Sequence, residues 1–132
     1  MRYMLDTNVC IDYLKGNSNN IRDRIISAPK DALCISAITL SELMYGVENS
    51  SNRETTLVAL DFFLLKIDII PYDDQAAAVY GVIRRQLKQE GNIIGGMDML
   101  IAAHAKSIEA VLVTHNTKEF CRVSGLETED WY

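Results

Sequence analysis

The chain has 132 residues, of which 48% are hydrophobic and 23% charged, a balance typical of one globular domain with a single hydrophobic core. The formal net charge of −5 excludes nucleic-acid binding through a general excess of positive charge, although a local basic groove or a metal ion would still allow it. No apolar run reaches the roughly 20 residues that span a bilayer, and Asp6 interrupts the apolar N-terminal stretch. We therefore expect a cytoplasmic protein without a membrane segment.

The first half of the chain predicts two strands and four helices. Residues 3–5 form a short apolar run typical of a buried strand, and capping residues at 6–8 begin a helix that ends before Gly16. A second short helix is predicted at 20–27, a strand at 33–35, and a helix at 39–49 with Thr39 or Ser41 near its N-cap. A long helix is predicted at 53–66. Its apolar face is expected to form a homodimer surface and consists of Leu57, Leu60, Phe63 and Leu64.

The second half continues the alternation of strands and helices. A strand at 67–71 ends at Pro71, and a long helix at 73–89 is closed by Gly91. Two glycines, at 95 and 96, separate it from a helix at 97–107, and 111–113 is a further core strand. The sequence ETEDWY can add an edge strand. This alternation predicts an α/β fold, a three-layer α/β/α sandwich with a central parallel sheet, and no linker divides residues 1–132 into more than one domain.

The three cysteines are Cys10, Cys34 and Cys121, an odd number without CxxC spacing. Each has apolar neighbours, so we expect buried free thiols rather than metal ligands or nucleophiles. Free thiols are typical of a reducing compartment.

Three acidic residues stand where a purely structural protein would carry apolar ones. Asp6 ends a strand that should be buried on both faces, and Glu42 has apolar neighbours on nearly every side of its helix. Asp98 shares a helix face with apolar residues of the segment 101–105. Each acid alone could be a satisfied core residue, for example a helix cap. Three together, without a buried Arg or Lys, favour a shared metal ion, because a buried carboxylate is costly unless it is paired or binds a cation.

The position of these acids supports a common site. Ligands of parallel α/β sheets bind at the carboxyl ends of the strands. Asp6 lies at that end of the first strand, Glu42 follows the second, and Thr114 and Asn116 follow the strand at 111–113. Oxygen ligands without His or Cys indicate Mg²⁺ or Mn²⁺ rather than zinc.

Four motifs in this order carry a resemblance to a known family: MLDTN, ITLSELMYG, IGGMDMLIAAHAKS and VLVTHNTKEF. Together they resemble the VapC toxins of the PIN-domain family, and GLETEDWY resembles the enterobacterial branch of those toxins. The similarity covers the whole chain. It implies a PIN fold, an endoribonuclease that depends on Mg²⁺ or Mn²⁺, and a VapB-type antitoxin as partner.

The resemblance also implies roles for individual residues. Asp6, Glu42 and Asp98 would form the acidic core that holds the metal. Thr7 and Asn8 follow the first acid and would orient it or bind a ligated water; with Thr114 they are expected at the substrate. The family often places a fourth acid where this chain has Asn116. That departure leaves two candidates for the fourth position, since Glu119 can supply a carboxylate and Asn116 can hold a water.

The expected reaction is hydrolysis of an RNA phosphodiester by a metal-activated water, leaving a 3′-hydroxyl and a 5′-phosphate. The resemblance implies the anticodon loop of the initiator tRNA as the target. Arg84, Arg85 and Lys88 form the best cationic cluster. They are either a solvated helix surface or contacts to RNA phosphates or to an acidic tail of the antitoxin.

The two histidines are not assigned to catalysis. His104 lies six residues after Asp98 on the same helix, which turns it away from the acidic face and predicts a surface or packing role. His115 lies at a strand end closer to the site, and we expect a structural or substrate-contact role there.

Other functional classes fit less well. A haloacid-dehalogenase-type phosphatase needs an acid where Asn8 stands, and a response-regulator receiver needs a lysine after the strand at 111–113 that is absent there. Gly95 and Gly96 do not begin a P-loop, because no GK[ST] follows. The remaining alternative is a PIN domain that binds partners without catalysis.

Overall fold

The computed structural model describes residues 1–132 and contains one sheet of five parallel strands in the order β3-β2-β1-β4-β5. The strands are β1 (Tyr3–Leu5), β2 (Leu33–Ser36), β3 (Asp68–Ile70), β4 (Val111–Val113) and β5 (Thr128–Glu129). The chain moves outward from β1 to β3 and then returns to the other side of β1 with β4. The strand order therefore reverses between β1 and β4, where a parallel α/β sheet places its ligands.

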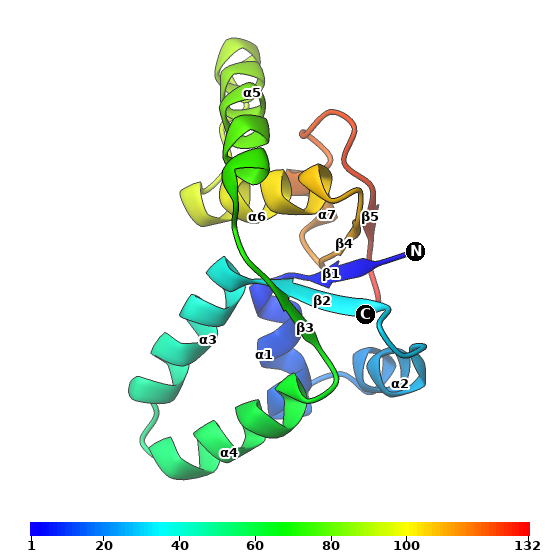
Figure 1. Ribbon diagram of the computed structural model, residues 1–132, viewed down its shortest axis with the longest axis vertical. Coiled ribbons are helices and arrows are strands. Elements are labelled where there is room, and N and C mark those ends of the chain that lie inside the picture. The colour runs from blue at the N-terminus through cyan, green and yellow to red at the C-terminus, as the bar shows by residue number, and fades with distance from the viewer.

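Seven helices cover the two faces of the sheet (Figure 1). One layer contains α1 (Thr7–Lys15), α2 (Asn19–Ser27), α3 (Ala37–Glu48) and α4 (Arg53–Leu64). The other contains α5 (Asp74–Glu90), α6 (Gly96–Ser107) and α7 (Thr117–Phe120). The predicted three-layer α/β/α sandwich is confirmed, including the edge strand in ETEDWY.

The sheet separates two hydrophobic cores rather than enclosing the single one that was expected. Side chains alternate between the two faces of a strand. Met4 and Leu112 therefore pack with α5 and α6, whereas Leu5 and Val113 pack with α1, α3 and α4. A three-layer fold requires both cores, because each helical layer must bury its own apolar face against the sheet.

The start of α3 differs from the prediction. The helix begins two residues early, and Ser36, the last residue of β2, is its N-cap: the Ser36 hydroxyl accepts the amide of Ile38 at 3.1 Å. Thr39, one of the two predicted N-caps, is instead a residue of α3 itself and is fully buried. A serine that belongs to a strand and caps the next helix is hard to recognise because its neighbours on one side are apolar.

The predicted dimer surface of α4 is wrong. Leu60 and Phe63 are buried in the core, and Leu57 and Leu64 pack against it. The exposed apolar side chains are instead Val58 and Phe62 of α4 and Leu65, the C-cap residue that follows this helix. The sequence shows two apolar stripes on one helix, and only tertiary packing decides which of them faces inward.

Two smaller expectations also change. Cys10 and Cys34 are buried free thiols as predicted, but Cys121 is exposed beside the short helix α7, which was not predicted. None of the helices has the length and apolar character that crossing a membrane requires.

Candidate metal-binding active site

Asp6 lies at the switch point of the sheet, directly after β1. Its backbone amide bonds to the Val113 carbonyl of β4 at 3.0 Å. Its carboxylate caps α1, with Oδ1 accepting the Val9 amide at 2.9 Å, and it also accepts a hydrogen bond from Thr114. The residue is only 6% exposed, and burial raises the pKa of its carboxyl group despite these bonds. Asp6 is thus a helix cap and a costly buried acid at the same time.

Glu42 approaches this acid from α3. Its carboxylate accepts the hydroxyl of Thr7 at 2.6 Å, and Thr7 also contacts Thr39 at 3.4 Å. Thr7 therefore orients Glu42, whereas the resemblance implied that it would orient Asp6 or bind a ligated water. The side chain of Glu42 is half-buried and its charge helps to raise the pKa of Asp6.

Asp98 and Glu119 form a second acidic pair. Asp98 is the third residue of α6, and Glu119 lies on α7, the short helix that follows β4. Partial burial, together with the charge and hydrogen bond of Glu119, raises the pKa of Asp98 to about 6. The pKa of Glu119 is lowered because its carboxylate accepts Asn116 Nδ2 at 2.7 Å and the Gly95 amide at 3.2 Å. As pH falls, Asp98 therefore takes up a proton before Glu119 does.

Asn116 and Glu119, the two candidates for the fourth position, are hydrogen-bonded to each other. Glu119 contributes the carboxylate that faces Asp98, and Asn116 holds it in place. The sequence contained a signal for this arrangement, because residues three apart lie on one face of a helical turn.

The acids gather at one edge of the sheet but do not converge on one point. No group of three His, Cys, Asp or Glu side chains lies close enough to hold an ion by direct contact. The donor set nevertheless fits Mg²⁺, which usually binds through one or two carboxylates and keeps several waters. Asp6 and Asp98 both have raised pKa values and each feels the charge of Glu42, so a cation would reduce the cost of their ionisation.

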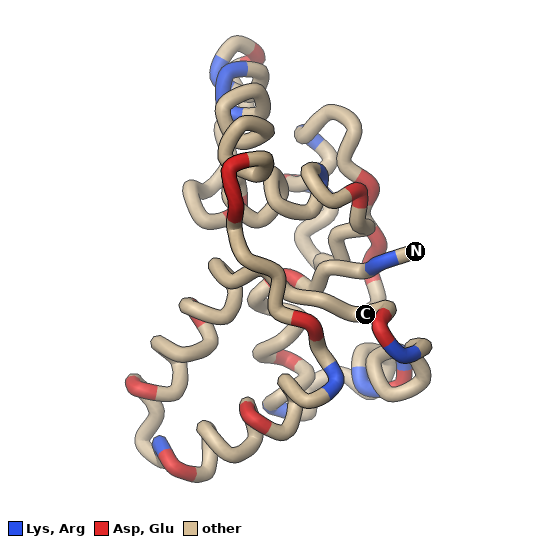
Figure 2. The backbone as a smooth tube through the Cα atoms, viewed as in Figure 1, with Lys and Arg blue, Asp and Glu red and all other residues tan.

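The remaining predicted substrate residues have different surroundings. Thr114 is fully buried and hydrogen-bonds Asp6, so it is placed to orient that acid. Asn8 is exposed. Arg84 and Arg85 are exposed on α5, which projects beyond the rest of the fold, and Figure 2 shows positive residues gathered at the far end of that helix.

Sequence reasoning missed two residues of the site. Asp12 on α1 lies near enough to Asp6 to raise its pKa, and the amide of Gly95 fixes Glu119. A Cβ atom at Gly95 would lie in van der Waals contact with Asp98 Oδ2, at 3.4 Å. The sequence contained only a weak indication that Asp12 belongs to the site: it is the next acid along the helix that Asp6 caps.

His104 has a packing role, one of the two roles, surface or packing, that its spacing predicted. It is 1% exposed, its Nδ1 bonds the hydroxyl of Ser36 at 2.7 Å, and its ring meets Tyr72 edge-on. Burial lowers the pKa of its imidazole, which favours the neutral ring. Because Ser36 caps α3, this contact joins the helix that carries Asp98 to the helix that carries Glu42.

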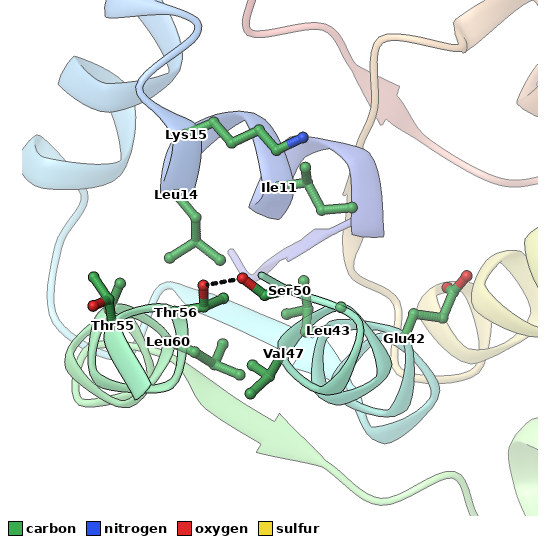
Figure 3. A pocket seen from close by; sticks show the side chains of 12 residues that line it. Ile11, Leu14, Lys15, Glu42, Leu43, Val47, Ser50, Thr55, Thr56 and Leu60 are labelled. Atoms are coloured by element: carbon green, nitrogen blue, oxygen red, sulfur yellow. Dashed lines mark hydrogen bonds between the residues drawn. The ribbon is translucent and has the colours of Figure 1, made fainter. Parts of the chain in front are cut away.

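A cavity of about 480 Å³ opens beside Glu42 between α1, α3 and α4 (Figure 3). Ile11 and Leu14 enter it from α1, and Leu43 and Leu60 from the opposite side. The Ser50–Thr56 hydroxyl pair, 2.8 Å apart, adds one polar contact to this mainly apolar lining.

Comparison with known proteins places this chain in a family. Residues 3–126 match the PIN domain family. The chain is 43% identical over 131 residues to the tRNA(fMet)-specific endonuclease VapC of Shigella flexneri, covering 99% of this chain and 98% of that protein. It is 40% identical to ribonuclease VapC2 of Rickettsia felis, with the same coverage.

Two solved structures are equally similar in fold. VapBC2 from Rickettsia felis, bound to a DNA fragment from its promoter, superposes with a TM-score of 0.94 at 39% identity over 100% of both chains. DNA-bound VapBC from Salmonella typhimurium gives 0.94 at 41% identity, covering 100% of this chain and 99% of that one. As the four sequence motifs predicted, the chain belongs to the PIN-domain family and, within it, to the VapC ribonucleases.

Proposed function

We propose that this protein is the endoribonuclease toxin of a VapBC-type toxin–antitoxin pair and acts on RNA in the cytoplasm. The observation that carries the proposal is the gathering of Asp6, Glu42 and Asp98 at the switch point of a PIN fold. In a PIN domain that only binds partners, acids whose ionisation is costly would have no function at this position.

PIN-domain nucleases generally depend on a divalent metal ion. In this chain Asp6, Glu42 and Asp98 would hold Mg²⁺, or Mn²⁺, directly or through waters, and Glu119 would complete the set. When bound, the ion polarises the scissile phosphate and activates a water molecule. Hydrolysis by water leaves a 3′-hydroxyl and a 5′-phosphate.

The chain's own groups keep these carboxylates in position for the reaction. The Val9 amide and Thr114 hold Asp6, and the Thr7 hydroxyl holds Glu42. Such bonds fix the direction of a carboxylate before substrate arrives, which avoids reorganisation during the reaction.

The proposed substrate is the initiator tRNA, cut in its anticodon loop. Relatives from Shigella flexneri and Salmonella typhimurium, at 43% and 41% identity, are named tRNA(fMet)-specific endonucleases. An acidic protein gains little from general electrostatic attraction to RNA phosphates. A folded RNA with an exposed loop is therefore a better substrate for it than RNA of arbitrary sequence and structure.

Arg84 and Arg85 are proposed to contact phosphates of the tRNA stem, away from the cleavage site. Because such a contact acts on binding, Arg84→Ala is expected to raise KM about threefold or more while kcat stays near the wild-type value. Steady-state kinetics on the tRNA measure both constants. A fall in kcat at unchanged KM would contradict the assignment.

The proposed partner is a VapB-type antitoxin, as in the VapBC complexes of similar fold. The cavity between α1, α3 and α4 supports this partner, because it is mainly apolar and Glu42 stands at its edge. A segment of the antitoxin seated there would lie beside the acidic site.

We also propose that the free protein forms a homodimer. The exposed side chains of Val58, Phe62 and Leu65, on α4 and at its C-cap, are available for contacts between the two copies. Static light scattering of the free protein measures the mass and so tests this proposal.

The proposed function is tested by incubating the purified protein with total cellular RNA and Mg²⁺ and sequencing the new 5′ ends. We expect 5′-phosphate ends in the anticodon loop of the initiator tRNA. Ends spread over messenger RNA with intact initiator tRNA would overturn the target and leave the nuclease. The absence of any new ends would favour a binding module without catalysis.

A further inference from the structure

Two aromatic rings form an exposed pair beside the acidic site. The centroids of His115 and Tyr132 are 4.2 Å apart with their planes tilted by 38°. The side chain of His115 is 66% exposed, so one side of its ring rests near Tyr132 while most of its surface faces solvent. Packing of the core does not require a ring in this position.

The pair is held in a fixed orientation by two aspartates. Asp130 Oδ2 bonds the Nδ1 of His115 at 3.0 Å, and Asp130 Oδ1 accepts the backbone amide of Tyr132 at 3.0 Å. The hydroxyl of Tyr132 donates to the carboxylate of Asp12 on α1. Rings fixed before binding lose little conformational entropy when a ligand stacks on them.

The pair lies at the rim of the proposed catalytic site. His115 follows β4 by two residues, and the last residue of β4 bonds the Asp6 amide. Asp12, which accepts the Tyr132 hydroxyl, is also close enough to Asp6 to raise its pKa. A molecule resting on the His115 ring would therefore lie beside the acids.

We propose that His115, supported by Tyr132, forms a subsite for an unpaired nucleobase of the RNA, next to the phosphate that is cut. The inference rests on the proposed function and adds the part of the substrate that this rim binds. An acidic site repels phosphates, whereas stacking of a base on an aromatic ring needs no positive charge and tolerates any base. Base stacking thus supplies affinity at the point where electrostatic attraction is missing.

Kinetics on a short hairpin RNA with the anticodon-loop sequence test the subsite. His115→Ala is expected to raise KM about fivefold or more with little change in kcat, since loss of base stacking weakens binding. His115→Phe keeps a ring for stacking and should restore most of the affinity. Tyr45→Ala, which removes an exposed ring on α3, is the matched control and should leave KM unchanged.

An abasic nucleotide placed in turn at each loop position identifies the stacked base. At one loop position, the abasic RNA should raise the KM of the wild-type protein as much as His115→Ala raises the KM for the intact RNA. For His115→Ala, the abasic RNA at that position should have the same KM as the intact RNA. Unchanged KM in His115→Ala, or His115→Phe as weak as His115→Ala, would overturn the stacking proposal. Thermal unfolding of each variant checks that the fold is retained.

The subsite and the nuclease activity can fail separately. If the wild-type protein cuts RNA and His115→Ala has the same KM, only the subsite is wrong. If the wild-type protein cuts nothing, the fluorescence anisotropy of the labelled hairpin still compares the two proteins. Weaker binding by His115→Ala would then support the base subsite, and equal binding would overturn it.

Discussion

Asp98 and Glu119 are close enough to share a proton, and this pairing depends on parts of the chain that are far apart in sequence. Asp6, Glu42 and Asp98 were recognisable from sequence because an acid in an apolar segment is unusual. The pairing of Glu119 with Asp98 was not, since it depends on how closely the Gly95 loop approaches α7. For the same reason Thr7 was assigned to its sequence neighbour Asp6 rather than to Glu42, 35 residues away.

The raised pKa of Asp98 predicts how stability depends on pH without metal. Between the ordinary pKa of 3.8 and the folded value of about 6, the folded protein binds more protons than the unfolded chain. Stability contributed by this group is therefore lost as pH rises through about 6. We expect the melting temperature in EDTA to rise by a few degrees from about pH 7 to about pH 5, and Mg²⁺ to stabilise most at the higher pH.

Asp98→Asn should make the melting temperature less dependent on pH and should remove most of the stabilisation by Mg²⁺. Asp61→Asn, which changes an exposed acid on α4, should keep both. The lowered pKa of Glu119 acts in the opposite sense, but only below its ordinary value of 4.5, outside the range measured. A melting temperature that rises with pH in EDTA over this range would contradict the assignment.

The helices bring the site together through a contact between α3 and α6. His104 on α6 bonds Ser36, the N-cap of α3, and these two helices carry Asp98 and Glu42. The spacing of His104 predicted packing, but the sequence could not reveal its partner, because Ser36 was hidden at the end of a strand. The exact face of α4 was likewise decided by packing against Tyr13 and the sheet.

His104→Ala is expected to destabilise the fold and to weaken metal binding. Removing the buried ring leaves a cavity and a Ser36 hydroxyl without its partner, which together cost about 2–4 kcal/mol. Thermal unfolding and Mg²⁺ titration measure the two effects. In a double-mutant cycle, the loss in the double variant should be smaller than the sum of the two single losses, because both substitutions remove the same His104–Ser36 bond while Ser36→Ala also removes the cap of α3. Additive losses would show that the two residues act independently.

The cavity between α1, α3 and α4 predicts a variant that separates inhibition from catalysis. Gly46 lines this cavity, and a Cβ atom there meets nothing within 4 Å. Gly46→Leu would fill the opening and is expected to weaken antitoxin binding about tenfold or more while RNA cleavage by the free toxin continues. Gly81→Leu on α5 is the matched control, since its Cβ also meets nothing within 4 Å.

Copurification with the antitoxin and titration calorimetry compare the two variants. Equal affinity of Gly46→Leu and the wild-type protein would place the antitoxin elsewhere. Equal loss of affinity in both glycine variants would indicate a general effect of the larger side chain on the fold.

The whole molecule is an acidic protein that is proposed to cut an acidic polymer. Its fold was predictable because strand and helix patterns alternate along the entire chain, and the order of four motifs identified the family. The relative placement of the acids was not, because it depends on two layers packing on opposite faces of one sheet. In the proposed function, the carboxylates at the switch point hold the cation, and the groups around them bind the RNA.

Cleavage of initiator tRNA by matched aspartate variants tests the central claim most directly. The wild-type protein and Asp61→Asn should cut with Mg²⁺ and stop in EDTA, while Asp98→Asn should lose about a hundredfold or more of the rate and keep its folded structure. Full cleavage by the wild-type protein in EDTA, or a rate for Asp98→Asn within about threefold of wild type at saturating Mg²⁺, would contradict a catalytic metal site at these acids.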